Sequence, residues 1–222
     1  MGLLRTVQMK VADFPEENPL STVLSPCTLT LYSSTIIWSG GITPAEKHME
    51  ESKMKFAVIY YSKTGHTREM GEEIAEGIRK QGGEVKLFSI EEPLDNEYIS
   101  ECSGVIFGTP VYLANTCWQM KKWFDTDSAS VKLAGKLGGV YSTAHFAQGG
   151  GDVALMTLIG HMLVKGMMIY SGGSALGKPY IHLGPVALDA VEGHYENSRE
   201  LFRIFGERFA AKAGELFENK NE

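Results

Sequence analysis

The chain contains a compact apolar segment, Phe56–Tyr61, that runs directly into a short polar segment and then into a helical pattern. Similar short apolar segments recur four times, and stretches with helical periodicity separate them. The expected strands are 56–61, 85–89, 105–109, 137–142 and 167–171. The expected helices are 66–81, 115–124, 152–165 and 195–217. Strands that alternate with helices predict an α/β protein with a parallel sheet covered on both faces.

The order of the five predicted strands follows from the handedness of their connections. Right-handed crossovers favour a doubly wound sheet in the order 2-1-3-4-5. The first helix carries Met70, Ile74 and Ile78 on one face, and the last helix repeats this pattern. The apolar residues of the last helix are Phe202, Phe205, Phe209 and Leu216. Ligands of such sheets bind beyond the carboxyl ends of the strands, so we examine the loops after strands 1, 3 and 4.

Residues 1–53 show no sustained period, and prolines with one Gly-Gly pair interrupt every candidate element. We therefore expect an irregular N-terminal extension over 1–53 and one domain over 54–222. Glu50-Glu51 can be encoded as a purine-rich stretch that resembles a bacterial ribosome-binding site before Met54. Two interpretations stay open: the extension is a genuine arm, or the gene was read from too early a start.

Bulk composition excludes several classes of protein. A formal net charge of -6 without a cluster of Lys and Arg argues against a nucleic-acid partner. No apolar run reaches the 18 or more residues of a membrane-spanning helix. Three cysteines, odd in number and without a Cys-x-x-Cys motif, favour reduced thiols in a cytoplasmic protein over disulfides or zinc.

The loop after the first strand joins it directly to a helix N-terminus with small hydroxyl residues and one glycine. Its residues are Ser62, Lys63, Thr64, Gly65, His66 and Thr67. Unpaired backbone N–H groups and the positive helix end would converge here, and hydroxyls can add donors. The spacing matches neither a nucleotide P-loop nor a dinucleotide loop, so a monophosphate fits better. An ordinary strand-to-helix turn is the alternative.

The loop after the third strand is suited to packing rigidly against a flat ring system. It contains Thr109, Pro110, Val111 and Tyr112, in which Pro110 fixes the backbone and Tyr112 supplies an aromatic cover. We expect Trp118 and Trp123, on the following helix, to pack in the core.

The loop after the fourth strand is rich in small residues. Its candidate ligand-binding residues are Ser142, Thr143, Ala144, His145, Phe146, Ala147, Gly149 and Gly150. Successive glycines permit a close approach of the backbone to a ligand, and Asp152 can cap the next helix. His145 is either a proton donor or a solvated loop histidine. The spacing of His161, His182 and His194 does not match a metal site, so we expect structural roles for them.

Together these motifs resemble the FMN loops of flavodoxin-like reductases, and in particular the WrbA family of NAD(P)H:quinone oxidoreductases. The similar segments are Tyr-Tyr-Ser-x-x-Gly-His from Tyr60, Phe-Gly-Thr-Pro from Phe107, Gly-Lys-Leu from Gly135 and Gly-Met-Met-Ile from Gly166. The resemblance covers Phe56 to Leu216. It implies FMN, with its phosphate at 62–67 and its ring between 109–112 and 142–147. It also implies NAD(P)H as co-substrate, a quinone-like acceptor, and a homo-oligomer, either dimer or tetramer.

Several departures limit what the resemblance implies. The family's long insertion between strands 2 and 3, which helps to build its tetramer, is short here, from Phe88 to Ser103. The family's substrate-pocket tryptophan has no counterpart among residues 127–129, and Val164 or Lys165 replaces a histidine. FMN binding is compatible with these changes, whereas quinone specificity and the tetramer do not follow.

Two functions remain open at this point. The chain offers no nucleophile–base pair or paired carboxylates, so a flavin would supply the redox chemistry. An FMN oxidoreductase that passes two electrons from NAD(P)H to a small acceptor is favoured by the modest charge and the glycine-rich loop. Tyr112, His145 and Phe146 are its candidate catalytic residues. The alternative is a flavodoxin-type carrier of single electrons between protein partners.

The domain boundary is testable by truncation. We expect a chain that starts at Met54 to fold and to bind FMN as well as the full chain, because the preceding residues offer no periodic apolar face to the sheet. Thermal melting and flavin fluorescence of both chains measure this. A much lower melting temperature after truncation would show that the extension belongs to the fold.

Overall fold

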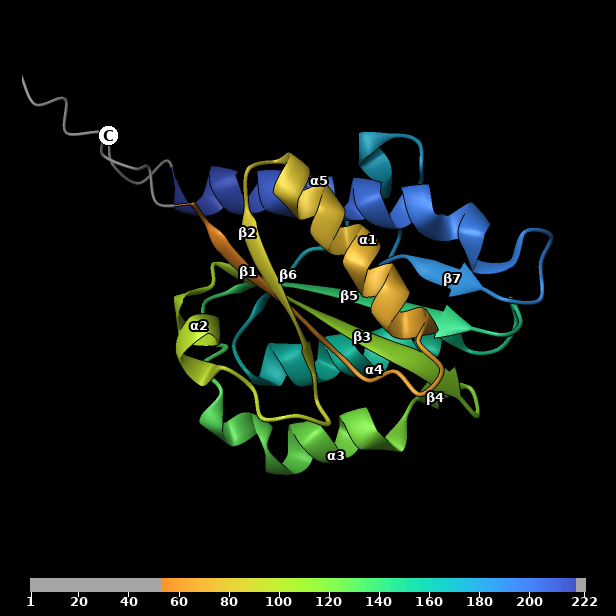
Figure 1. Cartoon of the computed structure of the whole chain (residues 1–222), viewed down its shortest axis with the longest axis horizontal. Helices are drawn as coiled ribbons and strands as arrows, with labels where there is room; N and C mark the ends of the chain where they lie inside the picture. Colours follow the sequence, from red (N-terminus) through yellow and green to blue (C-terminus); the bar gives the residue numbers. More distant parts are fainter. Residues whose placement is uncertain (1–52, 219–222) are drawn as a thin grey trace, which may run out of the picture. The chain divides into compact units, whose positions relative to one another are not determined.

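The computed structural model describes residues 53–218, in which a parallel sheet is covered by helices on both faces (Figure 1). Five parallel strands run in the order β2-β1-β3-β5-β6. They are β1 (Lys55–Tyr60), β2 (Glu84–Ser89), β3 (Gly104–Tyr112), β5 (Leu137–Ala144) and β6 (Met168–Ile169). The predicted fold class and strand order are confirmed. The predicted extension, apart from Lys53, lies outside the described residues.

Two further strands were not expected from the sequence. β4 (Asn115–Thr116) pairs antiparallel with the end of β3, and β7 (Val186–Leu188) pairs parallel with the end of β5. β3 therefore extends through residues 109–112, which the sequence analysis treated as a loop. Because β4 occupies residues 115–116, the next helix begins at Trp118 and not at 115.

The helices divide between the two faces of the sheet (Figure 1). One face is covered by α1 (His66–Lys80) and α5 (Arg199–Phe217), and the other by α2 (Asn96–Glu101), α3 (Trp118–Thr126) and α4 (Gly151–Val164). Short 3-10 segments are η1 (Ser128–Ser130), η2 (Ser174–Leu176) and η3 (His194–Ser198). Alternate residues of β1 point to opposite faces, so this strand contributes to both cores.

The predicted apolar faces of the two helices are largely confirmed. Met70, Ile74 and Ile78 of α1 are fully buried, and so are Phe202, Phe205 and Phe209 of α5. Leu216 is an exception, because it is 38% exposed near the end of α5. Trp118 was also expected in the core but is exposed at the first position of α3, whereas Trp123 is buried as expected.

The backbones of α1 and α5 are in direct contact where they cross. A Cβ atom on Gly77 would lie 2.0 Å from the carbonyl oxygen of Arg203, and one on Gly206 would lie 2.1 Å from that of Ile74. Glu73 reinforces the crossing with hydrogen bonds of 2.7 Å from both Arg199 and Arg203. The glycines therefore set how closely the two helices approach.

The connection between β2 and β3 contains α2, which has a specific anchor at each end. The Asp95 side chain accepts a hydrogen bond from the Tyr98 N–H at its N-terminus. At its C-terminus, the buried Lys136 ammonium donates to the carbonyl groups of Ser100 and Cys102, at 2.8 and 2.5 Å. Burial lowers the pKa of Lys136.

The helix crossing generates a stability prediction. We expect Gly206→Ala to lower the free energy of unfolding by about 1–3 kcal/mol, because the new methyl group meets a main-chain oxygen that cannot move aside. Gly214→Ala on the same helix is the matched control, since its Cβ would face only the flexible Glu218 side chain at 3.2 Å. That control should be neutral or stabilising by up to ~1 kcal/mol. Urea unfolding measures both, and equal midpoints for the two variants would contradict the prediction.

Candidate functional site

Three segments meet at the carboxyl edge of the sheet because β1, β3 and β5 are neighbours there. The first is the loop Ser62–Gly65, which joins β1 to α1. Gly65 is the residue before the helix and has a φ of +99°, a left-handed conformation that strains residues with a side chain. This turn aims the first N–H groups of α1 at the space above the strands.

The first loop leaves its backbone donors free. Among the described residues, no hydrogen bond is formed by the N–H groups of residues 62–67. The Ser62 hydroxyl instead accepts a bond from the Arg68 N–H at 3.3 Å. A set of free N–H groups at a helix N-terminus fits a small anion such as a phosphate.

Tyr141 and Thr67 tie the first loop to the third. The buried Thr67 and Thr143 hydroxyls are 2.8 Å apart, and the Tyr141 hydroxyl donates to the Thr67 carbonyl at 2.9 Å. Tyr141 reaches this position through space left by Gly108 and Gly71, whose Cβ atoms would lie 2.0 and 2.5 Å from its ring and hydroxyl. Burial raises the pKa of Tyr141 and keeps it a neutral donor.

The role of Tyr141 was not evident from the sequence. A tyrosine inside an apolar strand resembles an ordinary core residue, and its role depends on glycines from two other elements. Thr67 and Thr143 were expected to face a ligand, and in the structure their hydroxyls are hydrogen-bonded to each other.

The second segment is a β-hairpin and not an open loop. Val111 pairs with Thr116 and Tyr112 with Asn115, which leaves Leu113 and Ala114 as a two-residue turn. Both turn residues have positive φ, 48° and 63°. Such turns normally take Asn or Gly, so this hairpin carries conformational strain.

The hairpin buries some of the expected residues of the second segment and exposes others. Thr109 is fully buried, and its hydroxyl accepts from the Cys117 N–H at 3.2 Å, so it supports the hairpin from within. Pro110 and Val111 are half-buried, and Tyr112 is exposed. Partial burial raises the pKa of Tyr112.

The third segment covers the end of β5 and the loop that follows. Ser142, Thr143 and Ala144 are buried in the strand, whereas His145, Phe146 and Ala147 are exposed. The Ser142 Oγ is buried without a hydrogen-bond partner among the described residues.

One glycine of this segment, Gly150, allows a close approach between two parts of the protein. A Cβ on Gly150 would lie 2.5 Å from Ala114 of the hairpin, so the second and third segments touch through their backbones. Gly150 is also the N-cap residue, immediately before α4, with a φ of 94°. No side chain caps the helix there. The expected cap by Asp152 is therefore wrong, since Asp152 lies inside the first turn.

An acidic residue that the sequence analysis missed joins the third segment to the end of β7. Asp189 accepts hydrogen bonds from His145 and His194, with Oδ–Nδ1 distances of 2.8 and 3.0 Å. These bonds lower the pKa of Asp189. Next to this group, Tyr195 stacks on His66 of the first segment with ring centroids 4.4 Å apart.

The remaining histidines do not gather around a metal. His161 is half-buried against Phe124, and His182 is exposed. Within residues 53–218, no group of three or more His, Cys, Asp or Glu side chains could hold a metal ion. The part of the chain that the structure describes also contains no helix suited to crossing a membrane.

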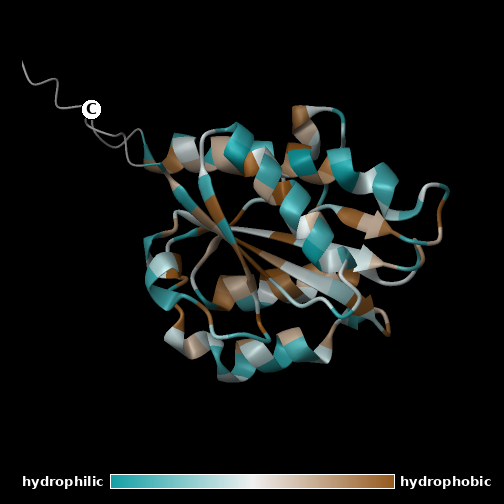
Figure 2. Cartoon of the chain, in the orientation of Figure 1, coloured by the Kyte–Doolittle hydropathy of each residue, from teal (hydrophilic) through white to brown (hydrophobic). Residues whose placement is uncertain are grey.

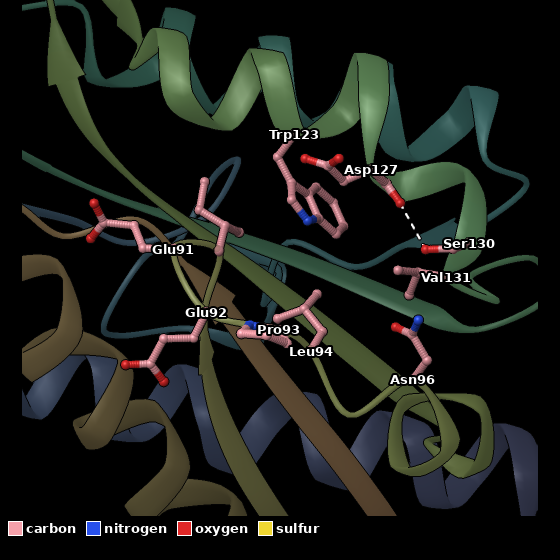
Figure 3. A pocket seen from close by; sticks show the side chains of 10 residues that line it. Glu91, Glu92, Pro93, Leu94, Asn96, Trp123, Asp127, Ser130 and Val131 are labelled. Carbon is pink, nitrogen blue, oxygen red and sulfur yellow. Dashed lines mark hydrogen bonds between the residues drawn. The ribbon is translucent and has the colours of Figure 1, made fainter.

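A separate cleft of about 340 Å³ lies between the segment after β2 and the end of α3 (Figure 3). Trp123, Leu94 and Val131 form its apolar part, and Glu91, Glu92 and Asp127 carry its charges. Residues of the three segments do not line it, so the cleft is distinct from the candidate site.

Comparisons with known proteins agree with this architecture. The sequence profile described as "Flavodoxin" matches residues 58–154. A "Flavodoxin" from Clostridium saccharobutylicum is 46% identical over 165 residues, which cover 74% of this chain and 100% of that protein. An "NAD(P)H dehydrogenase (quinone)" from Geobacter metallireducens is 29% identical over 63% of this chain and 79% of that protein.

A solved structure extends the comparison. The flavodoxin, WrbA-like protein from Agrobacterium tumefaciens has a TM-score of 0.60 and 25% identity, with 73% of this chain and 99% of that chain covered. The fold, the three converging segments and the full-length relative lead to one assignment. The chain belongs to the flavodoxin family.

Proposed function

We propose that the chain binds FMN across the three segments and carries electrons between protein partners. The observation that carries the cofactor assignment is the free set of N–H groups at residues 62–67, which suits the terminal phosphate. The flavodoxin family binds FMN, so the geometry and the family agree.

Each segment has a distinct role in this proposal. Residues 62–67 hold the phosphate, with the Ser62, Thr64 and Thr67 hydroxyls around it. Residues 109–112 and 142–147 flank the ring together with Gly149, and Gly150 keeps the hairpin against the third segment. Bound FMN would supply the redox chemistry, while the chain orients it and limits its contact with water.

The exposed side chains around the site favour a carrier. Tyr112, Leu113, Trp118 and Phe146 are apolar and exposed, and they surround the segments that would flank the ring. Exposed apolar groups at one site mark a surface for contact with another protein. The relative that is 46% identical over its full length is itself named a flavodoxin.

An FMN oxidoreductase that passes two electrons from NAD(P)H to a quinone is the second candidate. Relatives named NAD(P)H dehydrogenase (quinone) and the WrbA-like structure support it. The His145–Asp189 pair also favours it, because an exposed imidazole oriented by a carboxylate beside the third segment can donate a proton to a small acceptor. In that case Tyr112 and Phe146 would bound the face that admits both substrates.

The phosphate assignment predicts a preference among flavins. FMN should bind at least about 100-fold more tightly than riboflavin, because charge-assisted hydrogen bonds contribute about 1.5–3 kcal/mol each. Quenching of flavin fluorescence in parallel titrations measures both affinities. Equal affinities would show that residues 62–67 do not bind the phosphate.

An anaerobic titration separates the two functions. For a carrier, we expect NADH and NADPH to leave the flavin absorbance unchanged, whereas dithionite reduces it in two separate one-electron stages. Direct loss of the flavin bands on adding either nicotinamide would favour the oxidoreductase instead. In that case His145→Ala tests the proton donor. If His145 donates the proton, the variant should reduce quinone more slowly while its affinity for FMN stays unchanged.

A further inference from the structure

The cleft of about 340 Å³ beside α3 combines an apolar floor with an acidic rim (Figure 3). Trp123 and Val131 are buried and Leu94 is half-buried, so these three side chains form the floor. The rim carries three exposed carboxylates, which belong to Glu91, Glu92 and Asp127. A volume at the lower end of the range of ligand pockets suits a few side chains of an occupant.

The rim carboxylates have no ion-pair partner within residues 53–218, unlike the acids next to them in the sequence. Asp95 pairs with Lys86, and Asp125 pairs with Lys121. Among the described residues, no Lys, Arg or His side chain lines the cleft, and Lys122 lines only a smaller hollow beside it. A cleft lined by charges of one sign attracts the opposite sign, so the rim selects a cation.

The Trp123 side chain provides a second, independent observation. It is only 4% exposed, and its ring projects from α3 into the cleft (Figure 3). The rings of Phe107 and Phe124 pack against it, with centroids 5.7 and 5.1 Å away. Its indole N–H has no hydrogen-bond acceptor in the part of the chain that the structure describes. Because a buried indole N–H usually finds an acceptor, an occupant of the cleft has to supply one.

The cleft continues along α3 into the smaller hollow, which measures about 150 Å³. Both are lined by Ile90, Glu91, Trp123 and Asp127, and the exposed Trp118 lies at the other end of the hollow. Hydrophilic colour predominates along α3 (Figure 2), so an apolar trough beside this helix departs from its polar surface. The elongated outline suits an extended chain.

We propose that the cleft binds an extended basic peptide segment of a protein partner, in which an arginine stands next to an apolar residue. The guanidinium pairs with the rim carboxylates, and the apolar side chain packs on the floor. A main-chain carbonyl group of the segment accepts the hydrogen bond from the Trp123 N–H. This inference goes beyond the proposed function, because the three segments of the flavin site do not line the cleft.

The three features together select a peptide over other cations. A polyamine has the required charge but contains no acceptor for the indole N–H. Nucleic acids and acidic lipid surfaces carry phosphates, which the rim repels. A basic peptide contains a cation, an apolar side chain and a carbonyl acceptor within two or three residues.

Calorimetric titration of the full chain with FMN tests the binding of short peptides. Acetyl-Arg-Leu-Arg-amide should bind with a dissociation constant below about 1 mM, and more weakly as salt rises from about 0.05 to 0.5 M. Acetyl-Glu-Leu-Glu-amide should not bind. Putrescine, which carries the same charge as the basic peptide, should bind at least about threefold more weakly, because it contains no acceptor. Absence of peptide binding, or equal affinity for putrescine, would overturn the proposal.

Substitutions on the rim test its charges against a matched control. Glu91→Gln combined with Asp127→Asn should weaken peptide binding about threefold to tenfold, because two exposed ion pairs are lost. Asp125→Asn removes a charge from the same helix, but this carboxylate pairs with Lys121 and does not line the cleft. It should therefore leave the affinity unchanged. Equal losses in the rim variant and the control would show that only net charge matters, which would overturn the proposal.

Trp123→Phe tests the indole donor while it keeps an aromatic ring on the floor. We expect about threefold to tenfold weaker peptide binding, since one neutral hydrogen bond is lost. In NMR spectra, the indole signal that disappears in this variant identifies Trp123, and in the parent protein that signal should move downfield as peptide is added. Circular dichroism checks that the variant is folded, and flavin absorbance reports separately on the proposed FMN site. An indole signal that stays fixed at saturating peptide would overturn the proposal.

Discussion

The close crossing of α1 and α5 is the contact on which the position of the candidate site depends. Gly77 and Gly206 let two main chains touch, and the Glu73 carboxylate holds both Arg199 and Arg203 across the same crossing. Because α1 begins directly after the first candidate loop, the packing that fixes its axis also fixes the direction in which its first N–H groups point. Main-chain contacts are suited to this, since they have no side-chain rotamers to rearrange.

A second set of contacts connects helix α1 to the sheet. Tyr141 crosses from β5, past Gly108 of β3, to the first turn of α1, and its hydroxyl bonds to the Thr67 carbonyl. The third segment then touches the hairpin at Gly150 and Ala114. The three segments are therefore connected to one another through protein contacts, so the site is preorganised before a ligand binds.

Local sequence patterns were sufficient for the framework of this fold. Strand β1 and helix α1 each have a clear period, and Gly65 separates them at the position where a left-handed residue is required. The first candidate loop could therefore be placed from the sequence alone. Leu216 was assigned incorrectly because periodicity identifies one face of a helix but not where its packing partner ends.

The remainder of the site depends on non-local contacts. Leu113 and Ala114 have no turn signature, so the hairpin could not be recognised from residue type. Asp189 is 44 residues from His145 in the sequence, and their pairing follows from the parallel pairing of β7 with β5. The exposure of Trp118 has the same origin, because β4 moves the start of α3 by three residues.

The anchors of α2 have a consequence for how this protein tolerates added sequence. Asp95 secures one end of the helix, Lys136 secures the other, and neither anchor uses residues of the three segments. Closing a longer loop is entropically inexpensive, at about 0.6 kcal/mol for each doubling of its length. The link between β2 and β3 is therefore a natural insertion point, where a reporter or an extra domain can be grafted while the candidate site keeps its geometry.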